Sequence, residues 1–167
     1  MKHKILIVSA NYYRNISKNL VYDAKLTLDK SKVKYDKTDV PGVFEIPVVI
    51  AKNIKKYDGF IALGCVIKGK TPHFNFISRT TIEAIMNLSV ESKKPIGNGI
   101  LTCLNIEQAN DRSNPEGTKR KGREAVEKRF KHPAQLPKPT IVPERSSSYD
   151  EYRLAEPGES KRAVPVP

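Results

Sequence analysis

Three side chains able to do chemistry, Lys68, Thr71 and His73, lie close together in the segment from Gly64 to Phe74. The lysine supplies a cation, the threonine a hydroxyl, and the histidine an imidazole that titrates near neutral pH. Glycines in the segment leave backbone amides accessible, and a helix that begins here would attract anions to its N-terminal end. This combination could hold a phosphate group and transfer a proton.

Other candidate residues are spread along the chain, and each also has an ordinary structural explanation. Tyr12 and Tyr13 could stack on a flat heterocycle, or they could be amphipathic residues at a rim. Arg112 and Lys121 could clamp an anion, or they could be two solvated surface cations. His73 itself could cap or pack against the start of a helix. The residue types alone leave these alternatives open.

The elements that would position these residues follow from the pattern of apolar side chains. A nearly unbroken apolar run over residues 58–63 predicts a buried central strand. Apolar residues then recur at helical spacing from Ile77 to Leu88. Strands are also expected over 5–9, 33–40 and 96–103, with helices between them.

Strands that alternate with helices predict a parallel sheet covered on both faces. Right-handed crossovers make 2-1-3-4 the simplest strand order. We therefore expect an α/β fold, a flavodoxin-like three-layer sandwich around a four-stranded parallel sheet. Ligands bind just beyond the carboxyl ends of the strands in such sheets. The candidate residues follow strand ends, so the fold should gather them at one edge.

Side chains at the expected helix starts predict local structure. Asn15 is expected to cap the first helix, and Asn105 with Gln108 resembles a capping box. Phe44 and Glu45 follow a Pro-Gly turn. They could line a pocket, or Phe44 could form a hydrophobic staple at the start of the next helix.

Length and composition predict one α/β domain over residues 1–130, followed by a tail over 131–167. The chain has 167 residues and a net charge of +12. The tail contains seven of the twelve prolines and lacks a periodic apolar pattern, so we expect it to be disordered or peripheral. It carries six Lys/Arg against five Asp/Glu. The positive charge therefore belongs to the domain.

Several classes of protein are disfavoured by the sequence. The lysines are scattered and not interleaved with aromatic residues, which favours a solvated basic surface over a nucleic-acid interface. No apolar segment is long enough to span a membrane, and the apolar start is too short for a signal peptide. Cys65 and Cys103 fall in expected strands and predict packed thiols. Such thiols favour a cytoplasmic protein. We also expect no metal site, because the histidines are isolated in the sequence.

Three motifs, taken together, resemble the lumazine synthase family. Val40–Pro47 is similar to that family's VPGAFEIP loop, and Gly64–Phe74 is similar to its GxVIxGxTxHF loop. Asn105–Ala109, followed by Arg112 and Lys121-Gly122, is similar to its NIEQAxxR…KG ending. The motifs occur in the family's order, and the resemblance covers roughly residues 4–130.

The resemblance implies an activity, an assembly and a pathway. The reaction would be the condensation of 5-amino-6-(D-ribitylamino)uracil with 3,4-dihydroxy-2-butanone 4-phosphate. Its products would be 6,7-dimethyl-8-ribityllumazine, phosphate and water, in riboflavin biosynthesis. The resemblance implies no cofactor. It does imply a homopentamer, or a larger icosahedral shell built from pentamers.

The resemblance also implies roles for residues around the pyrimidine substrate. Tyr12 would stack on the pyrimidine ring. The Val43–Glu45 segment would line the ribityl chain and the ring. Cys65, Val66 and Ile67 would contact the pyrimidine through their backbone.

A second group of residues would handle the phosphate and the proton. Lys70 and Thr71 match the family's phosphate-binding loop, and Arg112 would clamp the phosphate. His73 would transfer the proton, and Lys121 would lie at the margin of the pocket.

Two features depart from the family's pattern. Asn98 replaces an aromatic residue that is common in the family, where the regions of Asn98 and Arg112 come from a neighbouring subunit. The last expected helix, from Lys121 to Phe130, is short and charged, and Pro133 follows it. These departures keep open a carrier or structural protein without turnover. The net charge of +12 keeps open a basic nucleic-acid-binding domain as a third function.

Overall fold

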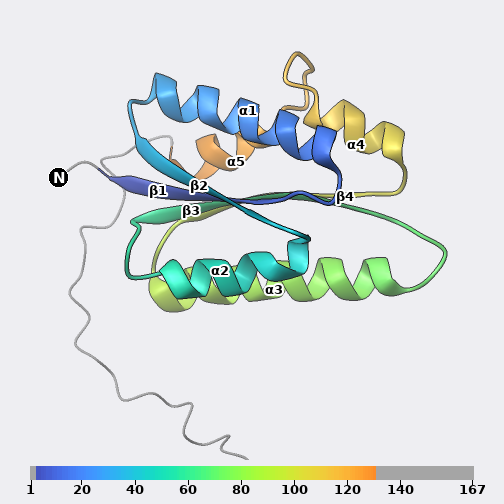
Figure 1. Ribbon diagram of the computed structural model, residues 1–167, viewed down its shortest axis with the longest axis horizontal. Helices are drawn as coiled ribbons and strands as arrows, with labels where there is room; N and C mark the ends of the chain where they lie inside the picture. Colours follow the sequence, from blue (N-terminus) through green and yellow to red (C-terminus); the bar gives the residue numbers. More distant parts are fainter. Residues whose placement is uncertain (1–2, 131–167) are drawn as a thin grey trace, which may run out of the picture.

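A computed structural model describes residues 3–130 of the chain and shows four parallel strands between two layers of helices (Figure 1). In chain order the elements are β1 (Lys4–Ala10), α1 (Arg14–Lys30), β2 (Lys34–Val40), the 3₁₀ helix η1 (Val43–Glu45), α2 (Ile46–Asn53), β3 (Gly59–Ile67), α3 (His73–Ser92), β4 (Ile96–Cys103), α4 (Ile106–Ser113) and α5 (Lys121–Phe130). The expected tail over 131–167 lies outside the described residues.

The sheet has the order β2-β1-β3-β4, and every pair of neighbouring strands is parallel. This confirms the predicted flavodoxin-like α/β fold. Strands β1, β3 and β4 are buried along most of their length, whereas β2 is exposed or half-buried except at Val40. A central parallel strand is covered on both faces, whereas β2 lies at an edge of the sheet.

Two hydrophobic clusters fill the space between the sheet and the helices. Ile5 and Ile7 of β1 pack with residues of α1, α4 and α5, whereas Leu6 and Val8 pack with residues of α2 and α3. Successive side chains of a strand point to opposite faces of the sheet, and this alternation explains the division. Figure 1 shows α1, α4 and α5 over one face and α2 and α3 over the other.

The two predicted caps have different outcomes. Asn105 caps α4 as predicted, because its Oδ1 accepts a hydrogen bond of 2.9 Å from the backbone N–H of Gln108. The expectation for Asn15 is wrong. Helix α1 already begins at Arg14, and Tyr13 occupies the cap position without a side-chain hydrogen bond. Asn15 therefore lies inside the first turn, where its side chain cannot serve as the cap.

The last helix is joined to the first by a buried carboxylate. The side chain of Asp23 in α1 accepts a hydrogen bond of 2.6 Å from the backbone N–H of Arg123 and also binds the guanidinium of Arg120. Close packing continues at Gly97 of β4, where an added Cβ would overlap the carbonyl oxygen of Ala125. Helix α5 thus lies directly against both α1 and β4. Within residues 3–130, no helix is both long and apolar enough to cross a membrane.

Candidate active site

The loops that follow the four strands meet at one edge of the sheet, at the right in Figure 1. Two backbone hydrogen bonds of 2.9 Å connect neighbouring strands there. One runs from the N–H of Asn11 to the carbonyl of Val40, and the other from the N–H of Lys68 to the carbonyl of Cys103. The first loop after β1 and the turn after β2 therefore lie together, as do the loops after β3 and β4.

The loop after β1 presents one tyrosine ring against another. Tyr12 is 75 % exposed, and its ring stands edge-on to that of Tyr13, with centroids 5.0 Å apart and an interplanar angle of 71°. Tyr13 is half-buried against the core. Burial raises the pKa of Tyr13, with smaller contributions from Tyr12 and Cys65, so its hydroxyl stays neutral. The arrangement leaves the Tyr12 ring available to a flat ligand, as the stacking interpretation requires.

The turn after β2 is held by Glu45. One of its carboxylate oxygens accepts a hydrogen bond of 3.0 Å from the N–H of Gly42. Val43 is buried, whereas Phe44 is 58 % exposed. The Val43 side chain therefore packs into the core, and the Phe44 ring lies at the surface near the carboxyl ends of the strands.

The chain goes from buried to exposed within a few residues at the end of β3. Cys65 is buried and Val66 and Ile67 are half-buried, whereas Lys70 and Thr71 are exposed. His73 is exposed as well and is the first residue of α3, and no side chain caps that helix start. Backbone N–H groups at an uncapped helix start are available to an anion. The hydroxyl, the cation, the imidazole and the helix end thus occur together, as predicted.

The two cysteines are packed thiols, as predicted, and are not bonded to each other. Burial raises the pKa of Cys65 to about 12, with smaller contributions from Cys103. Burial also raises the pKa of Cys103, and the positive charge of Arg112 partly opposes that shift. Neither thiol has the low pKa of a nucleophile. The effect of Arg112 also shows that α4 brings its guanidinium near the carboxyl end of β4.

Two predicted site residues lie away from this edge within one chain. Asn98 is half-buried in the middle of β4, where its Oδ1 accepts a hydrogen bond of 3.0 Å from the N–H of Ile100. Lys121 begins α5, with its Nζ 3.4 Å from a carboxylate oxygen of Glu124. The next residues of α5 bind Asp23, in the middle of α1. A single chain therefore does not bring Asn98 and Lys121 to Tyr12 and His73.

A cavity of about 520 Å³ lies beside the edge, over the first turns of α1. It shares Asn11 and Pro41 with the loops described above but contains none of the predicted site residues. The side chains that line it include two lysines and an arginine but no histidine, cysteine or carboxylate. The motifs did not point to this cavity. A sequence signal for it does exist: Arg14 and Lys18 are one helical turn apart with no acidic residue between them.

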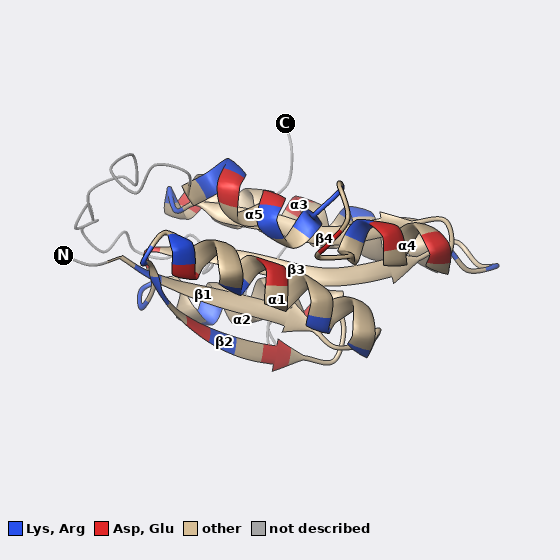
Figure 2. Cartoon of the chain, turned by 90° about the horizontal axis from the view of Figure 1, so that it is seen from above, with Lys and Arg blue, Asp and Glu red and all other residues tan. Residues whose placement is uncertain are grey.

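No metal site forms in the described part of the chain, where His, Cys, Asp and Glu side chains do not gather in groups of three or more. Helices α4 and α5 cover the same face of the sheet as α1, and basic and acidic residues are interspersed along both of them (Figure 2).

Comparison with known proteins identifies the family. The model of the 6,7-dimethyl-8-ribityllumazine synthase family matches residues 2–133. The 6,7-dimethyl-8-ribityllumazine synthase of Bartonella tribocorum is 44 % identical over 129 residues, which cover 75 % of this chain and 85 % of that protein. That of Bartonella bacilliformis is 46 % identical over 127 residues, 74 % of this chain and 83 % of that protein. That of Corynebacterium kroppenstedtii is 37 % identical over 124 residues, 74 % of this chain and 78 % of that protein. On this match, together with the fold and the three motifs, the chain belongs to the 6,7-dimethyl-8-ribityllumazine synthase family of riboflavin biosynthesis.

Proposed function

We propose that the chain condenses 5-amino-6-(D-ribitylamino)uracil with 3,4-dihydroxy-2-butanone 4-phosphate to give 6,7-dimethyl-8-ribityllumazine, phosphate and water. The observation that carries this proposal is the gathering of Tyr12, the Val43–Glu45 turn and the Lys70–His73 segment at one edge of the sheet. Their residue types match what the two substrates require: an aromatic face for the pyrimidine, and cations and N–H groups for the phosphate.

The chemistry needs few catalytic groups. The amine of the pyrimidine attacks the ketone and forms an imine with loss of water. A base then removes a carbon-bound proton while the phosphate leaves, and the resulting enol becomes a ketone. The ribityl-bearing amine attacks that ketone, and ring closure releases a second water. His73 is the proposed proton carrier, and Lys70 and Thr71 are the proposed phosphate ligands. Holding two substrates together is worth roughly 7–11 kcal/mol, so much of the rate would come from positioning.

The site is proposed to be completed by a second copy of the chain. Tyr12 and Phe44 are largely exposed, although stacking and elimination both benefit from exclusion of water. Asn98 and Lys121 lie elsewhere in the same chain, as described above. If Arg112 and Asn98 come from a neighbour, as in the family, each pocket would straddle two subunits.

The layer of α2 and α3 offers a surface for such assembly. Large apolar side chains stay exposed on it, namely Val48, Phe76, Met86 and Val90. Where exposed apolar side chains form a contiguous patch, they typically mark a protein–protein contact. A homopentamer, alone or within a larger shell, is the assembly that we propose.

Formation of the fluorescent lumazine from the two substrates, above the uncatalysed background, tests the proposal. We expect His73→Ala to lower kcat by about 10²–10⁴-fold without abolishing turnover, because positioning would remain. His3→Ala is the matched control, since His3 lies at the opposite end of β1 near Asp58. Wild-type turnover by His73→Ala would exclude His73 as the proton carrier.

The assembly needs a measurement of its own. Sizing the particle by light scattering should show a multiple of five chains, and Arg112→Ala should lose activity while it keeps that size. Arg123→Ala is its control, because Arg123 is an exposed arginine paired with Glu127 on α5, away from the layer of α2 and α3. Correctly assembled wild-type protein that forms no lumazine would overturn the proposed reaction and favour a carrier that keeps only the fold.

A further inference from the structure

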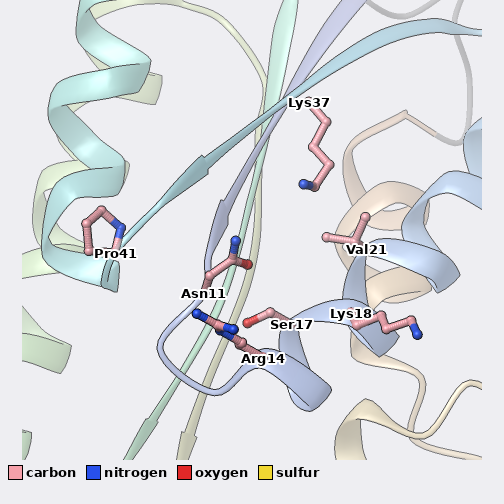
Figure 3. A pocket seen from close by; sticks show the side chains of 7 residues that line it. All are labelled: Asn11, Arg14, Ser17, Lys18, Val21, Lys37 and Pro41. Atoms are coloured by element: carbon pink, nitrogen blue, oxygen red, sulfur yellow. The ribbon is translucent and has the colours of Figure 1, made fainter.

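The cavity beside the candidate active site is lined by side chains from two elements and two loops. Its walls are formed by Asn11, Arg14, Ser17, Lys18, Val21, Lys37 and Pro41. In Figure 3, Lys37 extends from β2 toward the space that Val21 and Ser17 border on the side of α1. The Arg14 guanidinium lies close to Asn11 in the same view, and Lys18 extends from the next turn of α1.

The charge of this cavity is positive and only partly balanced. Among residues 3–130, neither Arg14 nor Lys18 forms an ion pair with an acidic side chain. Lys37 pairs with Asp39 on the same strand, which leaves an excess of two cations. The start of α1 has no acidic residue, and Asp23 is the first acidic residue of this helix.

This arrangement of charge is unfavourable in the absence of a ligand. Two cations one helical turn apart repel each other, and both lie near the positive end of the helix dipole, where acidic residues are the stabilising choice. Local patterns that break such a rule are expected at functional sites. An anion in the cavity would offset the repulsion between Arg14 and Lys18. It would lie between Arg14 and Lys37, which are on opposite walls.

The remaining walls suit a molecule larger than a simple ion. Asn11 offers a side-chain amide, and the Ser17 hydroxyl, only 1 % exposed, is held by donating to the carbonyl of Ala10. Val21 and Pro41 supply apolar surface. A volume of about 520 Å³ lies within the range of small-molecule pockets and exceeds what orthophosphate alone would fill.

We propose that this cavity binds a small molecule bearing a phosphate or diphosphate group, at a site separate from the candidate active site. The anionic group lies between Arg14 and Lys37, with Lys18 at the rim, and the rest of the molecule lies against Val21 and Pro41. The site contains none of the motif residues assigned to the condensation. Evidence for or against this binding site is therefore independent of evidence for or against the proposed condensation.

Titration of the full chain with pyrophosphate at low salt, followed by calorimetry, tests the site. The double variant Arg14→Ala/Lys18→Ala should weaken binding by at least about tenfold, which corresponds to about 1.4 kcal/mol. The double variant Lys52→Ala/Lys55→Ala removes the same charge from exposed positions outside the cavity and should bind as the wild type does. Equal weakening in both would indicate attraction by net charge alone and would overturn the proposal.

Two further measurements protect the result against misfolding and against binding at the active site. Hydrogen exchange of the wild-type chain should slow in peptides that cover 11–21 and 34–41 when pyrophosphate is added. Absence of this protection at saturating pyrophosphate would overturn the site even if a variant fails to fold. Thr71→Ala, outside the cavity, should retain the Arg14-dependent binding, and orthophosphate should bind more weakly than pyrophosphate.

Discussion

Removal of the Asp23 carboxylate should detach the end of the domain from α1. The Asp23 side chain is 2 % exposed and holds two partners, the guanidinium of Arg120 and the backbone N–H of Arg123. It therefore supplies both an ion pair and a cap for α5 across a long separation in sequence. Both interactions are lost in Asp23→Ala, whereas only the ion pair is lost in Arg120→Ala.

The structure gives magnitudes for both changes. Breaking a fully buried ion pair costs about 3–5 kcal/mol, and the 27 % exposure of the Arg120 side chain reduces this. A hydrogen bond to a charged group contributes about 1.5–3 kcal/mol. We expect Asp23→Ala to lower the free energy of unfolding by about 3 kcal/mol, and Arg120→Ala by about 1.5 kcal/mol. The difference measures the cap that Asp23 provides to α5.

Urea denaturation followed by circular dichroism, at one fixed chain concentration, measures these values. Concentration must be fixed because assembly stabilises the folded chain by mass action. The double variant Asp23→Ala/Arg120→Ala completes a cycle that isolates the coupling of the pair. Glu91→Ala, an exposed acid on α3, should change stability by less than about 0.5 kcal/mol. If Asp23→Ala costs no more than Arg120→Ala, the carboxylate does not cap α5 and the reasoning is refuted.

Three further predictions follow from burial and close packing. Gly97→Ala should cost about 1–3 kcal/mol in thermal unfolding because its Cβ would overlap the Ala125 carbonyl, whereas Gly69→Ala, with open space around it, should cost under about 0.5 kcal/mol. Because burial raises the pKa of Cys65 to about 12, about 10⁻⁴ of this thiol is ionised at pH 8, and an aromatic disulfide reagent should modify it at least about 10³-fold more slowly in native than in urea-unfolded protein. The same raised pKa should lower the free energy of unfolding as pH rises above 9, because the unfolded thiol then releases a proton that the folded thiol keeps. Rapid modification of the native protein would contradict the raised pKa and therefore both expectations. Tyr13→Ala should raise KM for the pyrimidine substrate and Tyr13→Phe should not, because the Tyr12 ring packs against the ring of Tyr13 and not against its hydroxyl. Equal kinetics for the two variants would exclude this role.

Elements whose signals are local could be predicted from sequence. The fourth strand has the predicted bounds, Ile96–Cys103, because apolar residues and the preceding Pro95 mark it. The Asn105 cap was also predictable, since its partner, Gln108, is three residues away. The same rule failed at Asn15, because the loop after β1 places Tyr13 at the cap and starts the helix earlier.

The candidate site was predictable to the extent that strand ends define it. Motif residues after β1, β2 and β3 do lie at one edge, because parallel strands place all their carboxyl ends together. Asn98 and Lys121 were not predictable in this way. Asn98 occupies the middle of β4, and the position of Lys121 depends on how α5 docks against α1. Their proposed part in the site requires a second copy of the chain.

The sequence by itself determined the alternation of strands and helices, the strand order, the family and the packed state of both thiols. These properties follow from apolar periodicity, chain handedness and motif spacing, each of which is written in neighbouring residues. Only the tertiary structure decided that Asp23 caps α5, and that Lys37 faces Arg14 across a cavity. Both arrangements join side chains from separate elements, and their distances are set by how the helices pack on the sheet rather than by any local pattern.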